Sequence, residues 1–217
     1  MLAQVHFQVD KLKSGVATKL AWAKNGTPHT LTSAADTLTI SDLTAKTFNV
    51  FLSHTIGTGS AYQIQERMRF NSDILSNYAI RQSRNNIADV AATSDNSVYH
   101  YDNNPDGERL IINYVINIST QEKLAIAFTG HTNTSGNIYA PLRQETVYKW
   151  VNTSLQITSV SLNNIFGNGD FAIGSNLSAL GEGTLVAVNI QNGTVFEETD
   201  TNRSYIWNSS TGAWTQL

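Results

Sequence analysis

Three oxygen-bearing side chains stand two residues apart in the segment 102–107. Asp102, Asn104 and Asp106 have the spacing that opens a calcium-binding EF-hand loop. The match fails at the twelfth position, where Asn113 stands in place of a bidentate glutamate. The same segment contains Pro-Asp-Gly, a common turn sequence, because Pro presets φ and Gly accepts a positive φ. We therefore interpret the segment as a turn and expect no cofactor, with calcium as the less favoured alternative.

Other residue sets that could support catalysis are weaker. Glu145 and Asp170 resemble the carboxylate pair of a glycosidase, but a chain with 17 acidic residues offers such pairs by chance. The five histidines lack the spacing of metal ligands, and the Gly-rich segments 57–59 and 167–170 lack the Lys-Ser/Thr ending of a phosphate loop. With no cysteine, thiol catalysis and zinc-thiolate sites are excluded. We predict that the protein is not an enzyme and binds no metal.

Aromatic residues are the remaining candidates for a binding role. Tyr99 and Tyr101 precede the Pro-Asp-Gly turn, where they would be placed to stack on a sugar ring. Tyr205, Trp207 and Trp214 lie near the end of the chain, in the segments 203–207 and 213–217, which flank a turn of Asn, Ser, Thr and Gly. This pattern predicts a β-hairpin, and a lone hairpin cannot bury three such side chains. We expect them to make an oligomer or lattice contact, because aromatic residues are enriched in interfaces.

Strands must position these candidates, because apolar and polar residues alternate with a period of two along most of the chain. Leu, Ile and Val fill both faces of 110–118, which predicts a central strand, and 123–129 follows it as a hairpin partner. Glu66 interrupts the apolar face of another candidate, and Asn192-Gly193 is a two-residue hairpin turn signal. The predicted strands are 4–9, 47–54, 62–70, 110–118, 123–129, 146–151, 156–162, 184–191 and 193–197.

Composition favours the same fold class. Only 14% of the residues are charged, against roughly 25% in typical soluble domains, while Ser, Thr and Asn make up about three residues in ten. Short polar side chains disfavour helices and suit turns and solvated strands. The best helical candidate, 73–91, is interpreted as strand plus loop. We predict an all-β, antiparallel β-sandwich of the jelly-roll or lectin-like type in residues 1–198, with a C-terminal β-hairpin in 199–217.

The bulk numbers also exclude two kinds of partner. The formal charge is −3, whereas nucleic-acid binding requires a basic surface. No run of about eighteen apolar residues is present, so membrane insertion is not expected.

Several motifs resemble those of tailed-bacteriophage virion proteins. The C-terminal Thr-Asp-Thr-Asn lead, aromatic pair, Gly turn and Trp form one of them. The stretch 107–183 adds Ile-Asn-Ile-Ser before a Lys-Leu strand, then Tyr-Lys-Trp, Asn-Thr-Ser and Ile-Thr-Ser. It ends with a Gly-x-Gly-Asp-Phe loop followed by Gly-Ser-x-Leu. Together these motifs cover about half of the chain. The first hundred residues carry no such motif.

The resemblance implies a non-enzymatic structural protein on the surface of a virion, as a capsid decoration, head fibre or tail component. Such a protein acts through oligomeric packing, with a trimer favoured, contacts other capsid or tail proteins, and is assembled in the host cytoplasm. The alternative is a receptor- or carbohydrate-binding module at a fibre or tail tip, in which Tyr99 and Tyr101 contact a host surface glycan.

Overall fold

The computed structural model describes residues 22–58, 64–85, 87–104, 107–132, 137–138, 140–165, 170–182, 192–198, 203–208, 210–211 and 213–217. The chain divides into two compact units. The larger is Ala23–Glu182, and the smaller takes in Met1–Trp22 and Gly183–Leu217. The predicted strands 4–9 and 184–191 lie outside the described residues.

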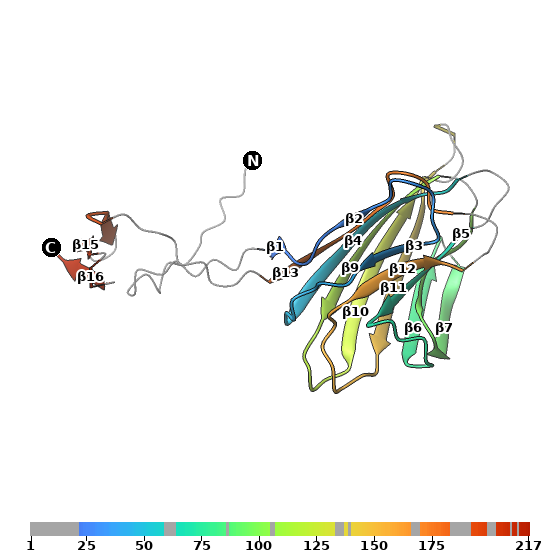
Figure 1. Cartoon of the computed structure of the whole chain (residues 1–217), viewed down its shortest axis with the longest axis horizontal. Helices are drawn as coiled ribbons and strands as arrows, with labels where there is room; N and C mark the ends of the chain where they lie inside the picture. The colour runs from blue at the N-terminus through green and yellow to red at the C-terminus, as the bar shows by residue number, and fades with distance from the viewer. Residues whose placement is uncertain are drawn as a thin grey trace. The chain divides into compact units, whose positions relative to one another are not determined.

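Two antiparallel sheets build the larger unit (Figure 1). The nine-stranded sheet has the order β1-β13-β4-β9-β10-β11-β6-β7, with β2 beside β13. Its strands are β1 (Trp22–Lys24), β2 (His29–Thr30), β4 (Phe48–Ile56), β6 (Tyr78–Arg84), β7 (Ile87–Asp95), β9 (Glu108–Ile116), β10 (Lys123–His131), β11 (Leu142–Trp150) and β13 (Asn176–Glu182). The four-stranded sheet has the order β3-β12-β5-β8, formed by β3 (Thr37–Ile40), β12 (Val160–Asn164), β5 (Ile64–Phe70) and β8 (Val98–Asn104).

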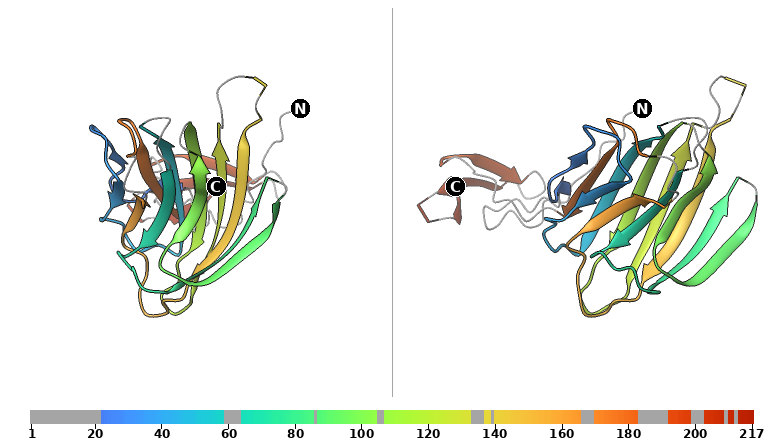
Figure 2. Two further views of the ribbon diagram at one scale, coloured as in Figure 1. Left: turned by 90° about the vertical axis from the view of Figure 1, so that its right-hand side faces the viewer. Right: turned by 45° about the vertical axis from the view of Figure 1, so that its right-hand side comes forward.

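The predicted fold class is confirmed at the level of an all-β, antiparallel sandwich. The smaller sheet lies across the larger one, as the two views of Figure 2 show. The described residues contain no helix. The described part of the chain therefore has no helix long and apolar enough to cross a membrane. The jelly-roll or lectin-like topology stays a prediction.

Strand periodicity placed the centre of the large sheet correctly. The β9–β10 hairpin is confirmed, with Asn113 opposite Ala127, and β9 lies between β10 and β4. Segment 73–91 is strand plus loop, as predicted, and contributes β6 and the start of β7. The predicted strand 156–162 begins only at Val160. Sequence reasoning missed β13, whose small and polar residues (Asn, Ser, Ala, Gly) give little strand signal.

An aromatic cluster fills one end of the sandwich. The Phe70 ring from the smaller sheet lies 5.9 to 6.3 Å from the rings of Phe51, Tyr78, Tyr148 and Trp150 on the larger one. These side chains point inward because they occupy alternate positions of their strands. The backbone N–H of Phe70 donates to the Tyr78 hydroxyl at 2.9 Å, so a polar group buried in this cluster is satisfied.

Polar side chains fill the other end. Thr55, Arg109 and His131 lie side by side on β4, β9 and β10, and all three are buried. Glu66 enters from β5 in the smaller sheet and accepts a hydrogen bond from the Thr55 hydroxyl. Burial raises the pKa of Glu66, although the charge of Arg109 and the Thr55 hydrogen bond oppose that shift. The interruption that Glu66 makes in an apolar strand face therefore marks a buried polar layer.

The smaller unit contains a three-stranded sheet of the order β14-β15-β16, formed by β14 (Val195–Glu198), β15 (Arg203–Asn208) and β16 (Ala213–Gln216). The predicted C-terminal hairpin is confirmed as β15–β16, with Trp207 opposite Trp214. β14 pairs with β15 and belongs to the smaller unit, which takes in Gly183–Leu217 together with Met1–Trp22. The division at residue 199 stays a prediction.

Candidate functional site

A pocket of about 300 Å³ lies beside the edge strand β8 of the smaller sheet. The last two strands of the larger sheet supply its apolar wall, because Ala92 of β7 is paired with Ile80 of β6 and Val90 with Gln82. Strands β5 and β8 supply the polar side. The pocket is lined by Gln65, Arg67, Ile80, Gln82, Arg84, Val90, Ala92 and Tyr99.

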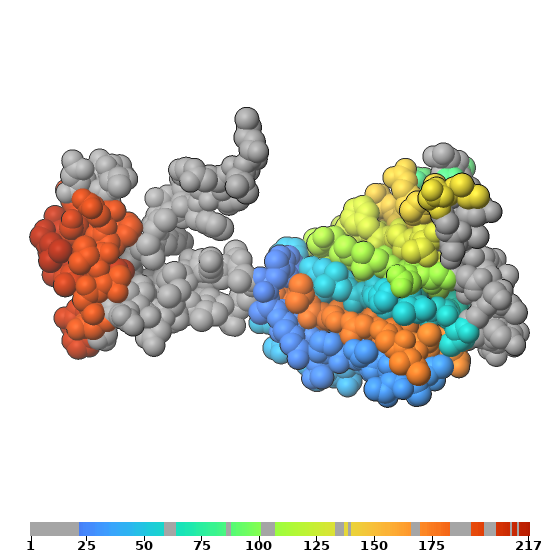
Figure 3. Space-filling view, turned by 90° about the horizontal axis from the view of Figure 1, so that it is seen from above, coloured from blue at the N-terminus to red at the C-terminus, as the bar shows by residue number. Residues whose placement is uncertain are grey.

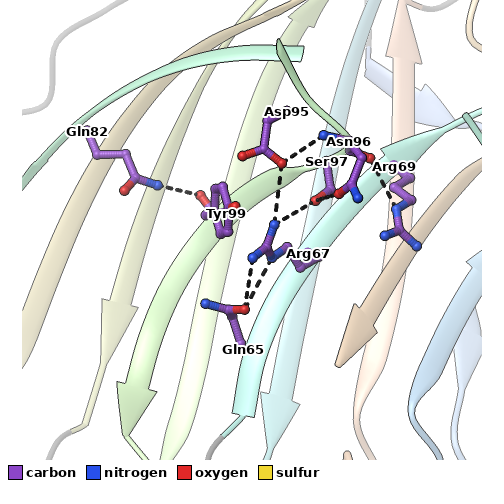
Figure 4. Close-up of polar contacts among 8 residues, drawn as sticks. All are labelled: Gln65, Arg67, Arg69, Gln82, Asp95, Asn96, Ser97 and Tyr99. Carbon is purple, nitrogen blue, oxygen red and sulfur yellow. Dashed lines mark hydrogen bonds and ion pairs between the residues drawn. The ribbon is translucent and has the colours of Figure 1, made fainter. Parts of the chain in front are cut away.

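Arg67 is the centre of the polar side (Figure 4). Its guanidinium carbon lies 3.3 Å from the centroid of the Tyr99 ring. Its Nε and Nη2 donate to Oε1 of Gln65 at 3.3 and 3.0 Å. Its Nη1 donates to Asp95 Oδ1 at 3.4 Å and to Ser97 Oγ at 3.1 Å. Four hydrogen bonds and a stacked ring hold this side chain in one orientation. A planar guanidinium is suited to this role because it can stack on a ring and donate several hydrogen bonds at once.

Tyr99 is held from the opposite sheet as well. The Gln82 side-chain amide donates to the backbone oxygen of Tyr99 at 2.9 Å, and that of Gln144 does so at 3.4 Å. These bonds tie β8 to β6 and β11. The β5–β8 ladder also shifts register on both sides of Glu66. Such irregularities re-aim side chains at a sheet edge.

Burial raises the pKa of the Tyr99 hydroxyl, and a hydrogen bond with Asp95 adds to the effect, which outweighs the opposing charge of Arg67. The hydroxyl therefore stays protonated at neutral pH. Because Arg67 covers one face of the ring, a ligand has to contact the other face or the edge. An aromatic ring, apolar walls and amide groups are the usual lining of a site that binds a small polar molecule.

The pocket includes one of the two tyrosines predicted to contact a ligand. Tyr101 pairs through its backbone with Glu66, and its side chain lies outside the described part. Arg67, Gln65 and Gln82 were missed by sequence reasoning. A signal was available, because residues 65, 67 and 69 are the polar positions that alternate with the apolar face of β5.

The predicted calcium residues fall largely outside the description. Asp102 and Asn104 belong to β8 through their backbone, while their side chains and the whole of Asp106 are not described. Among the described residues no group of three His, Asp or Glu side chains could hold a metal ion. Calcium at these residues stays the less favoured prediction.

The two acids considered as a glycosidase pair have different surroundings. Glu145 projects from the outer face of β11, where it is exposed. Asp170 shares a hydrogen bond with Asp36, and its backbone N–H donates to the Thr58 hydroxyl at 3.2 Å.

In the smaller unit the three predicted contact residues share one face of the sheet. Trp207 and Trp214 lie with their ring centroids 5.4 Å apart, and Tyr205 follows on the same face of β15. Phe196 of β14, which sequence reasoning missed, lies 6.4 Å from Tyr205 and 6.2 Å from Trp214. We call these four residues the aromatic face. All four remain partly exposed.

The aromatic face also contains a polar group without a partner. The indole N–H of Trp214 is buried and makes no hydrogen bond within the described part of the chain. Buried donors are nearly always paired in folded proteins, so an acceptor is expected from outside this sheet.

A scan against protein-family models and searches of curated proteins and of solved structures found no match for this chain. The sequence motifs and the two sites above are therefore the features that bear on function.

Proposed function

We propose that the chain is a non-enzymatic structural protein on the surface of a tailed-phage particle, a capsid decoration, head fibre or tail component that works by packing against copies of itself and against other virion proteins. The observation that carries the proposal is the aromatic face, which supports self-association. The phage setting rests on the resemblance of the sequence motifs to those of virion proteins.

The physical argument concerns the size of the smaller sheet. Three strands of four to six residues are too short to cover one another's side chains. Burying a large apolar side chain contributes on the order of 1.5–3 kcal/mol, so four partly exposed aromatic rings leave a substantial driving force for association. The trimer that the resemblance favours would bring one such face from each copy to a single axis. The sandwich then docks on the capsid or tail lattice.

The test is the mass of the full chain in solution. Trp207→Ser with Trp214→Ser should lower the assembly state while the sandwich keeps its fold by circular dichroism. Trp22→Ser is the matched control, because Trp22 is exposed and lies outside the aromatic face. Deletion of 199–217 should have the same effect as the double substitution. If both variants assemble like the unaltered chain, the proposal is wrong.

The pocket at Tyr99 favours a second function, glycan binding at a fibre or tail tip. The pocket volume of about 300 Å³ is at the lower limit for small-molecule sites. The salt bridge with Asp95 balances the charge of Arg67, and the amides of Gln65 and Gln82 suit the hydroxyl groups of a sugar. On a glycan array, the oligomeric protein should bind hexose-containing glycans, and Tyr99→Ala should lose the signal. An array without hits would exclude this function.

A further inference from the structure

The outer face of the nine-stranded sheet carries a continuous apolar surface. On β9 and β10 most outward positions are apolar, with Leu110, Tyr114, Leu124 and Phe128 exposed, and Val147 of β11 adjoins them. Ile112 and Ile126 fill the space between them and are half-buried. We call these seven residues the outer apolar face. The other outward positions of β11, Arg143, Glu145 and Lys149, are charged and border the apolar surface. Figure 3 looks onto this sheet, with β13, β4 and β9 as neighbouring orange, cyan and green bands.

The arrangement reverses the usual pattern of a sandwich. The inward positions of β9 include Arg109 and Asn113, and those of β10 include Lys123 and Thr129, all buried. An antiparallel sheet that covers a core normally points polar residues outward. Here solvent meets the apolar side of the two central strands. A contiguous apolar patch of this kind marks an interaction site.

We infer that the outer apolar face packs against the same face of a second copy of the chain, as two sheets stacked face to face. This interface lies in the larger unit and is independent of the aromatic face.

The size of the surface fits this occupant. Strands β4, β9, β10 and β11 have nine residues each. At a spacing of about 4.8 Å and a length of about 30 Å per strand, the outer sides of these four strands together offer on the order of 600 Å², with the outer apolar face at the centre and the charged positions of β11 at the rim. Two copies would bury about 1,200 Å², which reaches the range of specific protein interfaces.

The charges around the face favour a second copy over a charged surface. Lys149 lies 2.7 Å from Glu122, and Arg81 lies 3.9 Å from Asp89. At the other side of the face, His54 lies 3.9 Å from Glu108. A rim that carries both signs, including the exposed Arg143 and Glu145 of β11, offers no basic field for an anionic membrane or a nucleic acid. The identical rim of a second copy, which also carries both signs, is compatible with this rim.

The relief of the face is self-complementary. A hollow of about 370 Å³ is lined by Leu110, Phe128 and Gly130, which has no side chain. The charged residues Arg84, Arg143 and Glu145 complete its lining. The Tyr114 ring lies 6.4 Å from the ring of Phe128, which borders the hollow. In the ladder, Gly130 is paired with Leu110 and Ile126 with Tyr114, so Tyr114 lies about four residues, or about 13 Å, from the Gly130–Leu110 pair. A two-fold axis between the sheets, running across the strands midway, brings Tyr114 of each copy over the other copy's hollow.

The test uses the full chain carrying Trp207→Ser and Trp214→Ser, so that association through the aromatic face is absent. Sedimentation equilibrium should still give a dimer. Adding Phe128→Glu should weaken that dimer on the order of tenfold or more, because a charge then enters an apolar interface. Gly130→Trp should do the same by filling the hollow, where an added Cβ meets no atom within 4 Å. Leu75→Glu, at a residue that is also exposed but lies outside the face, should leave the dimer intact.

A monomer before Phe128→Glu is added, or a dimer that Phe128→Glu leaves unchanged, would overturn the inference. Flotation with phosphatidylcholine vesicles that Phe128→Glu abolishes, with no change in mass, would overturn it in favour of a lipid surface. The proposal that the aromatic face mediates association fails by a different result, namely an unaltered assembly state in the chain with Trp207→Ser and Trp214→Ser.

Discussion

The guanidinium carbon of Arg67 lies 3.3 Å from the centre of the Tyr99 ring, and the two residues face each other across the β5–β8 pair. This stack joins the interior strand β5 to the edge strand β8 of the smaller sheet. It also fixes the ring that borders the proposed sugar pocket. The position of Tyr99 thus depends on a side chain that sequence reasoning did not select.

Arg67→Lys should destabilise the fold by about 1–2 kcal/mol, because lysine keeps the charge but loses the planar stack and the paired bonds to Gln65. Urea unfolding at neutral pH measures the change. Arg81→Lys is the control. The Arg81 side chain is 66% exposed, so its ion pair contributes little, and the change should stay within about 0.5 kcal/mol. Equal effects at both positions would show that the stack does not stabilise the sheet edge.

His100 should make the stability of the fold depend on pH. Burial lowers its pKa from the ordinary 6.5 to about 3, so the folded state holds a neutral ring while the unfolded state takes up a proton below pH 6.5. Stability is therefore full above pH 6.5 and is lost as the pH falls toward 3. Between pH 7.5 and 4.5 the loss due to His100 should be about 2–3 kcal/mol.

The variant His100→Phe should lose that part of the pH dependence and keep the edge-on contact with Tyr148, whose ring lies 6.2 Å away. Urea titrations at the two pH values compare the slopes. His54→Gln, on the outer face of β4, should retain the pH dependence of the unaltered chain. A His100→Phe chain with an unchanged slope would show that another group is responsible.

Phe196→Ser should weaken assembly of the full chain as the tryptophan substitutions do, because Phe196 contacts both Tyr205 and Trp214 on the aromatic face. Val195→Ser is its neighbour on the opposite face of β14, where Val195 is exposed, and should have no effect on mass. Light scattering after size exclusion compares the two. The proposal that association uses one face of this sheet predicts this asymmetry, and equal results would contradict it.

Gly26→Ala should destabilise the larger unit by about 1–3 kcal/mol. Gly26 has φ +76°, and a Cβ would lie 2.7 Å from Cγ2 of Ile40 and 2.9 Å from Oδ1 of Asp42. That carboxylate accepts two bonds from Thr27, so it is not free to move away. Gly130→Ala, where a Cβ meets nothing, should change the unfolding free energy by less than about 0.5 kcal/mol. Thermal or urea unfolding tests the pair.

Strand alternation made the centre of the large sheet predictable. The hairpin of β9 and β10 could be predicted from the sequence because its strands are neighbours in the chain and their connection is short. The pairing of β14 with β15 was not predicted. Asn192-Gly193 predicts a hairpin with 184–191, which lies outside the described residues and stays a prediction. A turn signal points to the partner on one edge of a strand and carries no information about a strand that pairs with its other edge.

Only part of the site at Tyr99 could be predicted from the sequence, because most of its residues come from strands that are distant in the chain. The aromatic residue was visible in the sequence, but its partners come from β5, β6 and β7. Side chains from three other strands meet it only because two sheets stack with β8 at an edge. Glu66 shows the same limit, since the sequence marks it as an exception on an apolar face without showing that Thr55 and Arg109 lie opposite.

The sequence by itself determined the period of two, the all-β class and the C-terminal hairpin, because these depend on neighbours a few residues apart. The tertiary structure decided which side of each strand faces inward. Alternation on β9 defines two faces, one with Arg109 and Asn113 and one with Leu110 and Tyr114. It does not say which of them meets the second sheet, because that depends on chain segments far away that cover one face and leave the other open.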